Sequence, residues 1–110
     1  MAADLDLLQG TLDVLVLKTL SWGPRHGYAV AEWIRQTTKG TLSIEENALY
    51  TSLHRMEKRK WIESEWGLSE NNRKAKYYQL TRAGRAQLAQ RATRWTSYAI
   101  AVNQVLTATG

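Results

Sequence analysis

Cysteine and the common catalytic motifs are missing from this chain. Its 110 residues include no cysteine, which excludes disulfides, zinc-thiolate sites, iron-sulfur clusters and a cysteine nucleophile. The sequence also has no phosphate-cradling glycine loop and no nucleophile-elbow motif. The two histidines, His26 and His54, stand too far apart in sequence and context to indicate a metal site. We therefore expect no enzyme, no metal and no cofactor.

A long uninterrupted apolar segment is missing as well. The longest apolar run near the start, residues 12–20, is broken by Asp13 and Lys18. The residues before it include Asp4 and Asp6 and lack the basic stretch that opens a signal peptide. These features predict a soluble, cytoplasmic protein without a membrane partner.

Length and composition are those of one ordinary folded domain. Hydrophobic residues make up 44% and charged residues 23% of the chain, which argues against disorder. A chain of 110 residues is long enough for a single core and too short for a large multidomain enzyme. We therefore expect one compact unit.

Positive charge is concentrated in the middle of the chain, whose formal net charge is +5. Residues 55–94 hold eleven basic residues against four acidic ones, whereas residues 1–54 hold four against six. Residues 95–110 carry no charged side chain. This concentration favours a polyanionic partner, with nucleic acid ahead of an anionic membrane surface, and a merely solvated basic face is the alternative.

Apolar spacing predicts three helices in the first half of the chain. Leucine and valine recur at helical spacing over residues 5–20, and the aspartates at the start supply an N-cap. A second amphipathic helix is predicted over residues 28–38, with Tyr28 on its apolar face. Ser43 and Glu46 have the spacing of a capping box, which predicts that a third helix begins there and runs to about residue 60.

The second half reads as a hairpin followed by a long helix. Residues 61–66 alternate as a strand does, residues 74–80 are a second β-prone run, and turn residues separate the two. Thr81 is the expected N-cap of the last helix. Tryptophans outside that helix are expected to be packing residues; they are Trp22, Trp33, Trp61 and Trp66.

The last predicted helix carries apolar residues at the 4-3-4-3-4 spacing of a coiled-coil seam. The seam consists of Leu88, Ala92, Trp95, Ala99, Val102 and Leu106. Such a seam needs a partner helix, and a wide exposed apolar face is otherwise a liability. We therefore predict a homodimer with these residues at its interface; the alternative is that the helix packs back on its own domain.

The order of the elements is that of a winged helix-turn-helix: a mainly α fold with a two-stranded β wing, extended by a long C-terminal dimerisation helix. In that layout the third helix enters the major groove and the wing touches phosphates. Leu49, Leu53 and Met56 share the face that would pack on the core, and polar residues lie opposite. The predicted DNA-binding residues are Asn47, Tyr50, Thr51, His54, Arg55 and Lys58 on the helix and Arg73, Lys74 and Lys76 on the wing.

Four segments in order resemble the PadR family of transcriptional regulators. They are LQGTLDVLVL at residues 8–17, HGYAV at 26–30, LYTSLHRME at 49–57 and YYQLTRAG at 77–84. The resemblance implies a DNA-binding domain over residues 1–80 and a dimerisation helix over residues 81–110, as in the family's small subtype. It also implies a repressor that a small molecule or stress signal releases. The chain departs from the family pattern at Thr51, where proline is common, and at Lys60, where glycine is common.

The resemblance also suggests where an effector would bind. In some small regulators of this family, aromatic side chains of the last helix line a cavity at the dimer interface that accepts flat, hydrophobic compounds. The corresponding candidates here are Trp95 and Tyr98, with Leu8, Val14 and Leu15 of the first helix. Simple core packing of Trp95 is the preferred interpretation, because aromatic residues at helical spacing usually belong to a core.

A different class of function is compatible with the same composition. The chain would then be a protein-interaction or ligand-sensing dimer module without specific DNA binding, and its basic region would serve solubility alone. Weak, sequence-independent DNA binding would indicate that module. Tight binding that survives scrambled competitor DNA would indicate a regulator.

Overall fold

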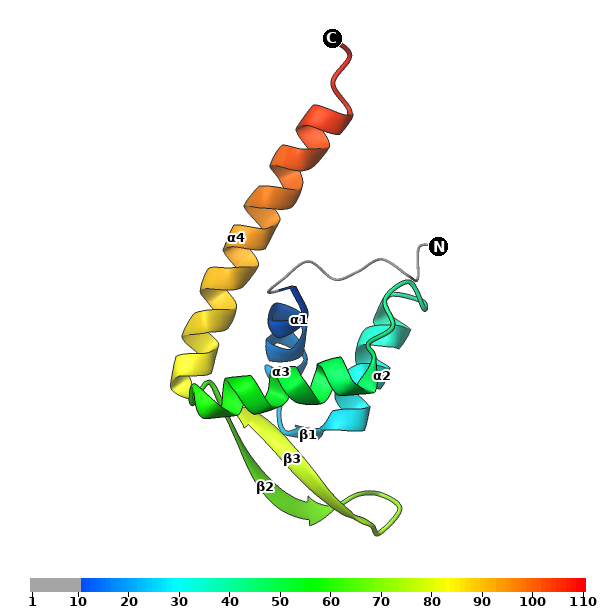
Figure 1. The fold of residues 1–110 in the computed structure, drawn as a ribbon, viewed down its shortest axis with the longest axis vertical. Helices are drawn as coiled ribbons and strands as arrows, with labels where there is room; N and C mark the ends of the chain where they lie inside the picture. Colours follow the sequence, from blue (N-terminus) through cyan, green and yellow to red (C-terminus); the bar gives the residue numbers. More distant parts are fainter. Residues whose placement is uncertain (1–10) are drawn as a thin grey trace.

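The computed structural model describes residues 11–110, and within them four helices lie on one side of a small sheet, whose hairpin projects away from them (Figure 1). The elements are, in order, α1 (Thr11–Leu20), β1 (Arg25–His26), α2 (Gly27–Thr37), α3 (Glu46–Lys58), β2 (Ile62–Leu68), β3 (Lys74–Leu80) and α4 (Arg82–Leu106). Each predicted helix is therefore confirmed within the described residues, and residues 5–10 of the first one lie outside them. The expected N-caps Asp4 and Asp6 and the candidate Leu8 lie outside the described residues.

The sheet has three antiparallel strands in the order β1-β3-β2. Its larger part is the predicted hairpin, in which Ile62 pairs with Leu80 and Leu68 with Lys74. The sequence did not predict β1, because two residues are too few to show an alternating pattern. In this strand His26 pairs with Tyr77 and connects the start of α2 to the wing.

The hydrophobic core lies where α1, α2 and α3 meet the base of the hairpin. Its buried residues are Val16, Leu17, Leu20, Val30, Ile34, Leu49, Leu53, Met56, Ile62, Tyr78 and Leu80. The predicted inner face of α3 is confirmed, since Leu49, Leu53 and Met56 are all buried. Burying that face fixes the rotation of α3 about its axis and turns its polar side to solvent.

The capping box predicted at the start of α3 is wrong. The helix begins at Glu46, so its N-cap is Glu45, and the Glu45 side chain makes no capping hydrogen bond. Ser43 lies two residues further upstream in an extended segment. The required spacing is therefore absent, because Glu46 occupies the first helical position and not the third.

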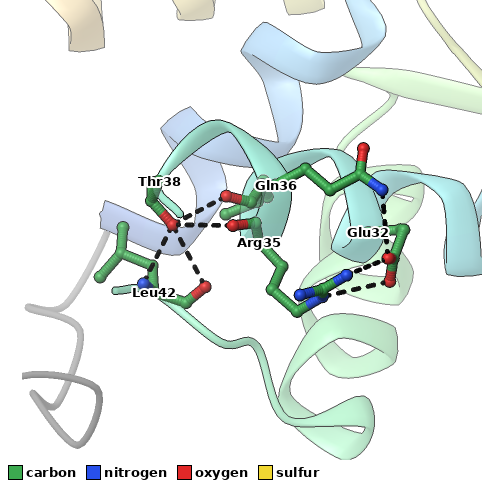
Figure 2. Close-up of polar contacts among 6 residues, drawn as sticks. Glu32, Arg35, Gln36, Thr38 and Leu42 are labelled. Carbon is green, nitrogen blue, oxygen red and sulfur yellow. Dashed lines mark hydrogen bonds and ion pairs between the residues drawn. The ribbon is translucent and has the colours of Figure 1, made fainter. Parts of the chain in front are cut away.

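The hydroxyl of Thr38 holds the segment between α2 and α3 (Figure 2). It donates a hydrogen bond to the Ile34 carbonyl at 2.9 Å and accepts one from the Leu42 amide at 3.0 Å. The Thr38 contacts secure the end of α2 and the entry of the chain into the following segment.

On the exposed side of α2, Arg35 forms an ion pair with Glu32 and lowers the pKa of that carboxyl.

The end of α3 adopts a left-handed cap at Lys60, the position where a glycine would be expected. Lys60 has φ of +64°, its amide donates to the Glu57 carbonyl, and the Trp61 amide donates to the Met56 carbonyl. These two bonds form a Schellman motif. For a residue with a side chain, this left-handed conformation is less stable than the right-handed helical one by about 1–2 kcal/mol. The helix consequently ends at Lys58, slightly earlier than predicted.

Two of the four tryptophans expected to pack do not. Trp33 and Trp61 are partly buried against the core, as predicted. Trp22 and Trp66 are 58% and 60% exposed, which corrects the expectation for both. Trp22 follows the end of α1, and its ring lies tilted by 46° against the Trp33 ring with a centroid distance of 5.2 Å. Trp66 lies on β2, where the Lys74 ammonium meets one part of its ring and the rest is open to solvent.

Thr81 caps α4 and attaches it to the corner between α3 and β2. Its hydroxyl accepts from the Gly84 amide at 3.1 Å, which confirms the predicted N-cap, and lies 2.7 Å from the Lys60 carbonyl oxygen. Leu88 then packs against the core. Beyond this point α4 extends away from the domain (Figure 1), and Gly84 is the one residue of α4 that is buried in the described protomer.

Candidate nucleic-acid interface

The polar face of α3 is open to solvent, as predicted. Asn47, Thr51, His54 and Lys58 are all exposed, and they share one side of the helix opposite the buried leucines. Amide, hydroxyl, imidazole and ammonium groups are the side chains that contact bases and phosphates in DNA complexes. The structure therefore places the helix part of the predicted site on one continuous surface.

The wing presents its cations on the side that continues toward α3. A cleft of about 420 Å³ lies between the start of α2, α3 and the hairpin. It is lined by His26, Gly27, Tyr28, Tyr50, Trp66, Ser69, Arg73, Lys74, Ala75, Lys76 and Tyr78. The Lys74 ammonium lies 5.3 Å from the centre of the Trp66 ring, within the range of a cation–π contact. The predicted wing residues and Tyr50 are thus brought together around one cleft.

The opposite side of the wing carries acidic side chains. Glu63 and Glu65 are exposed there, and the Gln79 amide donates to Glu63 at 2.9 Å. A second hollow on this side is lined by both glutamates together with Pro24 and Tyr77. Since carboxylates repel phosphates, the wing attracts a polyanion from one side only.

Lys76 differs from the other two cations of the wing, because it is partly buried between α3 and β3. Its ammonium lies 3.9 Å from a Glu57 carboxylate oxygen and 5.9 Å from the centre of the Tyr78 ring. Glu57 also accepts a hydrogen bond from Ser64 at 2.5 Å. Arg73 and Lys74 are exposed and thus better placed than Lys76 to meet phosphates.

Arg55 is turned from the polar face of α3 toward α1, where it meets a buried acid. Its Nη2 atom lies 2.5 Å from Asp13 Oδ1, and the Ser52 hydroxyl donates to the same oxygen at 2.6 Å. The hydrogen bond from Arg55 to Asp13 raises the pKa of the guanidinium. Arg55 therefore has a structural partner within the domain, and its predicted contact with DNA stays a prediction.

Sequence reasoning missed two aromatic residues of the cleft. Tyr28 was assigned to the apolar face of the second helix, yet it is exposed in the first turn of α2. Trp66 was expected to pack and is also exposed. For Trp66 the available signal was its position in the strand that leads into the basic turn, since aromatic and cationic residues interleave at nucleic-acid surfaces. Tyr28 stands far from the basic wing in the sequence and gave no such signal.

The proposed dimer seam of α4 is mostly uncovered in the described protomer. Leu88 packs on its own core, Ala92 and Ala99 are partly covered, and the remaining seam residues are exposed. The exposed ones are Trp95, Val102 and Leu106. The ring of the seam residue Trp95 lies 5.8 Å from the Tyr98 ring. Helix α1, which packs against α4, holds the half-buried Val14 and Leu15. Leu8 is outside the described residues.

The model of the PadR-like family of transcriptional regulators matches residues 16–90 of this sequence. The chain belongs to the PadR family. This confirms the resemblance noted above and the expectation that the protein is not an enzyme, because members of the PadR family are regulators of transcription. Membership of this family of transcriptional regulators also supports a DNA-binding regulator as the general function of the protein.

Solved structures and a sequence relative resemble the chain over most of its length. A PadR-like transcriptional regulator from Bacillus cereus is 28% identical with a TM-score of 0.79, over 93% of this chain and 97% of that one. A PadR family transcriptional regulator from Eggerthella lenta is 30% identical with a TM-score of 0.76, over 92% and 86%. "Uncharacterized protein X" from Lysinibacillus sphaericus is 32% identical over 82% of this chain and 83% of its own.

The winged-helix fold with a long C-terminal helix is thereby confirmed for this PadR family member. Within residues 11–110, no helix combines the length and the apolar character that crossing a membrane requires.

Proposed function

We propose that this PadR family protein is a homodimeric, sequence-specific DNA-binding repressor of the cytoplasm. The observation that carries the proposal is the shared orientation of two surfaces. Tyr50, which flanks the exposed polar face of α3, lines one cleft together with the cations of the wing, and the acidic side chains of the wing lie on its other face. This arrangement suits a negatively charged ligand that touches both elements at once.

In the proposed complex, α3 enters the major groove and reads base edges. Asn47 would bond adenine, and Lys58 would bond guanine or a phosphate. Tyr50, Thr51 and His54 would donate to phosphate oxygens and fix the register of the helix. Thr51 stands where the family commonly has proline, and α3 runs without interruption from Glu46 to Lys58.

The wing would hold the adjacent sugar-phosphate backbone through Arg73 and Lys74, with Lys76 contributing less because it is engaged with Glu57. Phosphate contacts position the protein but carry no sequence information directly. The wing is therefore expected to set affinity and salt dependence, and α3 is expected to set sequence preference.

Dimerisation would occur through residues 81–110, since α4 leaves its domain with an uncovered apolar face. Association of two such helices would bury this face and place two copies of α3 in half-sites about one helical turn, roughly 34–36 Å, apart. We also propose that a flat, hydrophobic effector inserts beside the seam residue Trp95 and its neighbour Tyr98, whose rings are both exposed. Binding there would shift the spacing of the two copies of α3 and release DNA.

The test of DNA binding is fluorescence anisotropy with DNA from upstream of the protein's own gene, against scrambled competitor at several salt concentrations. Tight binding that survives the competitor is expected. Lys58→Ala and Lys74→Ala should each weaken binding to every sequence and lower the salt slope by about one charge. Arg94→Ala is the matched control, because it removes one positive charge from the exposed part of α4 and should leave the slope unchanged.

Equal loss of binding to specific and scrambled DNA would contradict the proposal and favour the interaction module. An unchanged salt slope for both Lys58→Ala and Lys74→Ala would remove those residues from the interface. Sedimentation at micromolar concentration tests the dimer separately, and a stable monomer would contradict the two-site arrangement.

A further inference from the structure

Tyr50 occupies a position that depends on a residue of another helix having no side chain. Gly27, the first residue of α2, is buried against the Tyr50 ring. A Cβ atom built on Gly27 would lie 2.6 Å from the Tyr50 hydroxyl oxygen, 2.9 Å from Cζ and 3.0 Å from Cε1. Carbon atoms in contact normally stay about 3.5–4.0 Å apart. No residue with a side chain at position 27 is therefore compatible with this place for the ring.

The Tyr50 side chain borders two hollows on the surface. One is the cleft between α3 and the wing, and the other is a hollow of about 310 Å³ between α2 and α3. Tyr50 lines both of them. The ring consequently has room to move away from α2 if a methyl group at position 27 displaces it, without any change in the core.

We propose that Gly27 is a positioning residue for DNA binding, which holds the Tyr50 hydroxyl at the edge of the DNA cleft. This inference rests on the proposed function, because it assigns the hydroxyl a phosphate oxygen of DNA as its partner. Gly27 itself is buried and does not touch the DNA. Its contribution is to let the ring lie directly against the first turn of α2, facing the wing.

The backbone of Gly27 allows a test in which affinity and stability change independently. Gly27 lies in the first turn of α2, and its φ is outside the left-handed range that disfavours side chains. Alanine is a better helix former than glycine. Gly27→Ala should therefore leave the thermal stability unchanged or raise it once the ring has moved aside, while it lowers the affinity for DNA. A purely structural role for Gly27 predicts that both decrease together.

The experiment measures anisotropy with the operator DNA and thermal unfolding for four proteins: the natural chain, Gly27→Ala, Tyr50→Ala and the double variant. Loss of a hydrogen bond to a charged group typically lowers the binding affinity roughly tenfold or more. We expect Gly27→Ala to weaken DNA binding roughly tenfold in the presence of Tyr50, and to have no effect in the Tyr50→Ala background. Tyr50→Phe should lose most of the same affinity, because the hydroxyl is the group that is positioned.

Equal loss of affinity from Gly27→Ala with and without Tyr50 would overturn the inference, as would unchanged affinity in the single variant. If Gly27→Ala unfolds, the double variant should recover the fold, since the overlap needs both side chains; failure to recover would also overturn it. Absence of specific DNA binding by the natural chain is a separate result, which would instead contradict the proposed function.

Discussion

The buried carboxylate of Asp13 offers a sharp test of how α1 is joined to α3. Asp13 is 4% exposed and accepts hydrogen bonds from Ser52 and Arg55, at 2.6 Å and 2.5 Å. It lies in the first turn of α1, while both partners belong to α3. Asp13→Ala removes the shared acceptor and leaves both donors in place.

The expected loss follows from the burial of each donor. Ser52 is 1% exposed, and a buried hydroxyl without a partner costs roughly 1–3 kcal/mol. The Arg55 side chain is 42% exposed, so water replaces its lost partner and its share is at most about 1 kcal/mol. We expect the free energy of unfolding to fall by about 2–3 kcal/mol. Because Asp13 raises the pKa of Arg55, the contribution of this shift is present at neutral pH and is lost as pH rises into the strongly alkaline range.

Urea denaturation followed by tryptophan fluorescence measures this loss, at a fixed protomer concentration because association shifts apparent stability. Ser52→Ala alone and together with Asp13→Ala completes a double-mutant cycle, with an expected coupling of about 1–2 kcal/mol. A loss below about 0.5 kcal/mol for Asp13→Ala, or additive effects of the two changes, would refute the reasoning. The hydrogen bonds from α3 to Asp13 of α1 would then contribute nothing measurable to the free energy of unfolding.

Three other substitutions test the local geometry. Gly84→Ala should lower the free energy of unfolding by about 2–3 kcal/mol in urea, because its Cβ would lie 2.0 Å from the Trp61 carbonyl oxygen; an unchanged midpoint would contradict that close contact. Lys60→Gly should raise stability by about 0.5–1 kcal/mol by relieving the left-handed φ, whereas the control Lys60→Ala should not. Burial raises the pKa of Tyr78, and Glu57 adds to the effect, so the unfolded chain loses this proton first and stability falls above about pH 10. Tyr78→Phe should flatten that decline in urea midpoints measured against pH, and an equal decline in both proteins would argue against it.

Local patterns in the sequence accounted for most elements of the fold and for the polar face of α3. Helical spacing identified Leu49, Leu53 and Met56 as the buried side, so the opposite side followed from the geometry of a helix. The N-cap at Thr81 was also predictable, because a threonine hydroxyl bonds an amide only three residues away. The capping box at Ser43 was wrong although the spacing of Ser43 and Glu46 matched the motif. The N-cap of α3 is Glu45, two residues after Ser43, so Ser43 does not occupy the capping position.

By itself, the sequence determined the order of the four helices and the hairpin, the face of α3 that is buried and the concentration of basic residues around α3 and the wing. These properties depend on neighbours within a few positions along the chain. Only the tertiary structure decided that Arg55 turns toward Asp13, that Trp66 stays uncovered beside Lys74, and that Gly27 lies against Tyr50. Each of these contacts joins residues from different elements. The distance and direction between them arise when the elements pack on the core, and no periodic pattern along the chain encodes them.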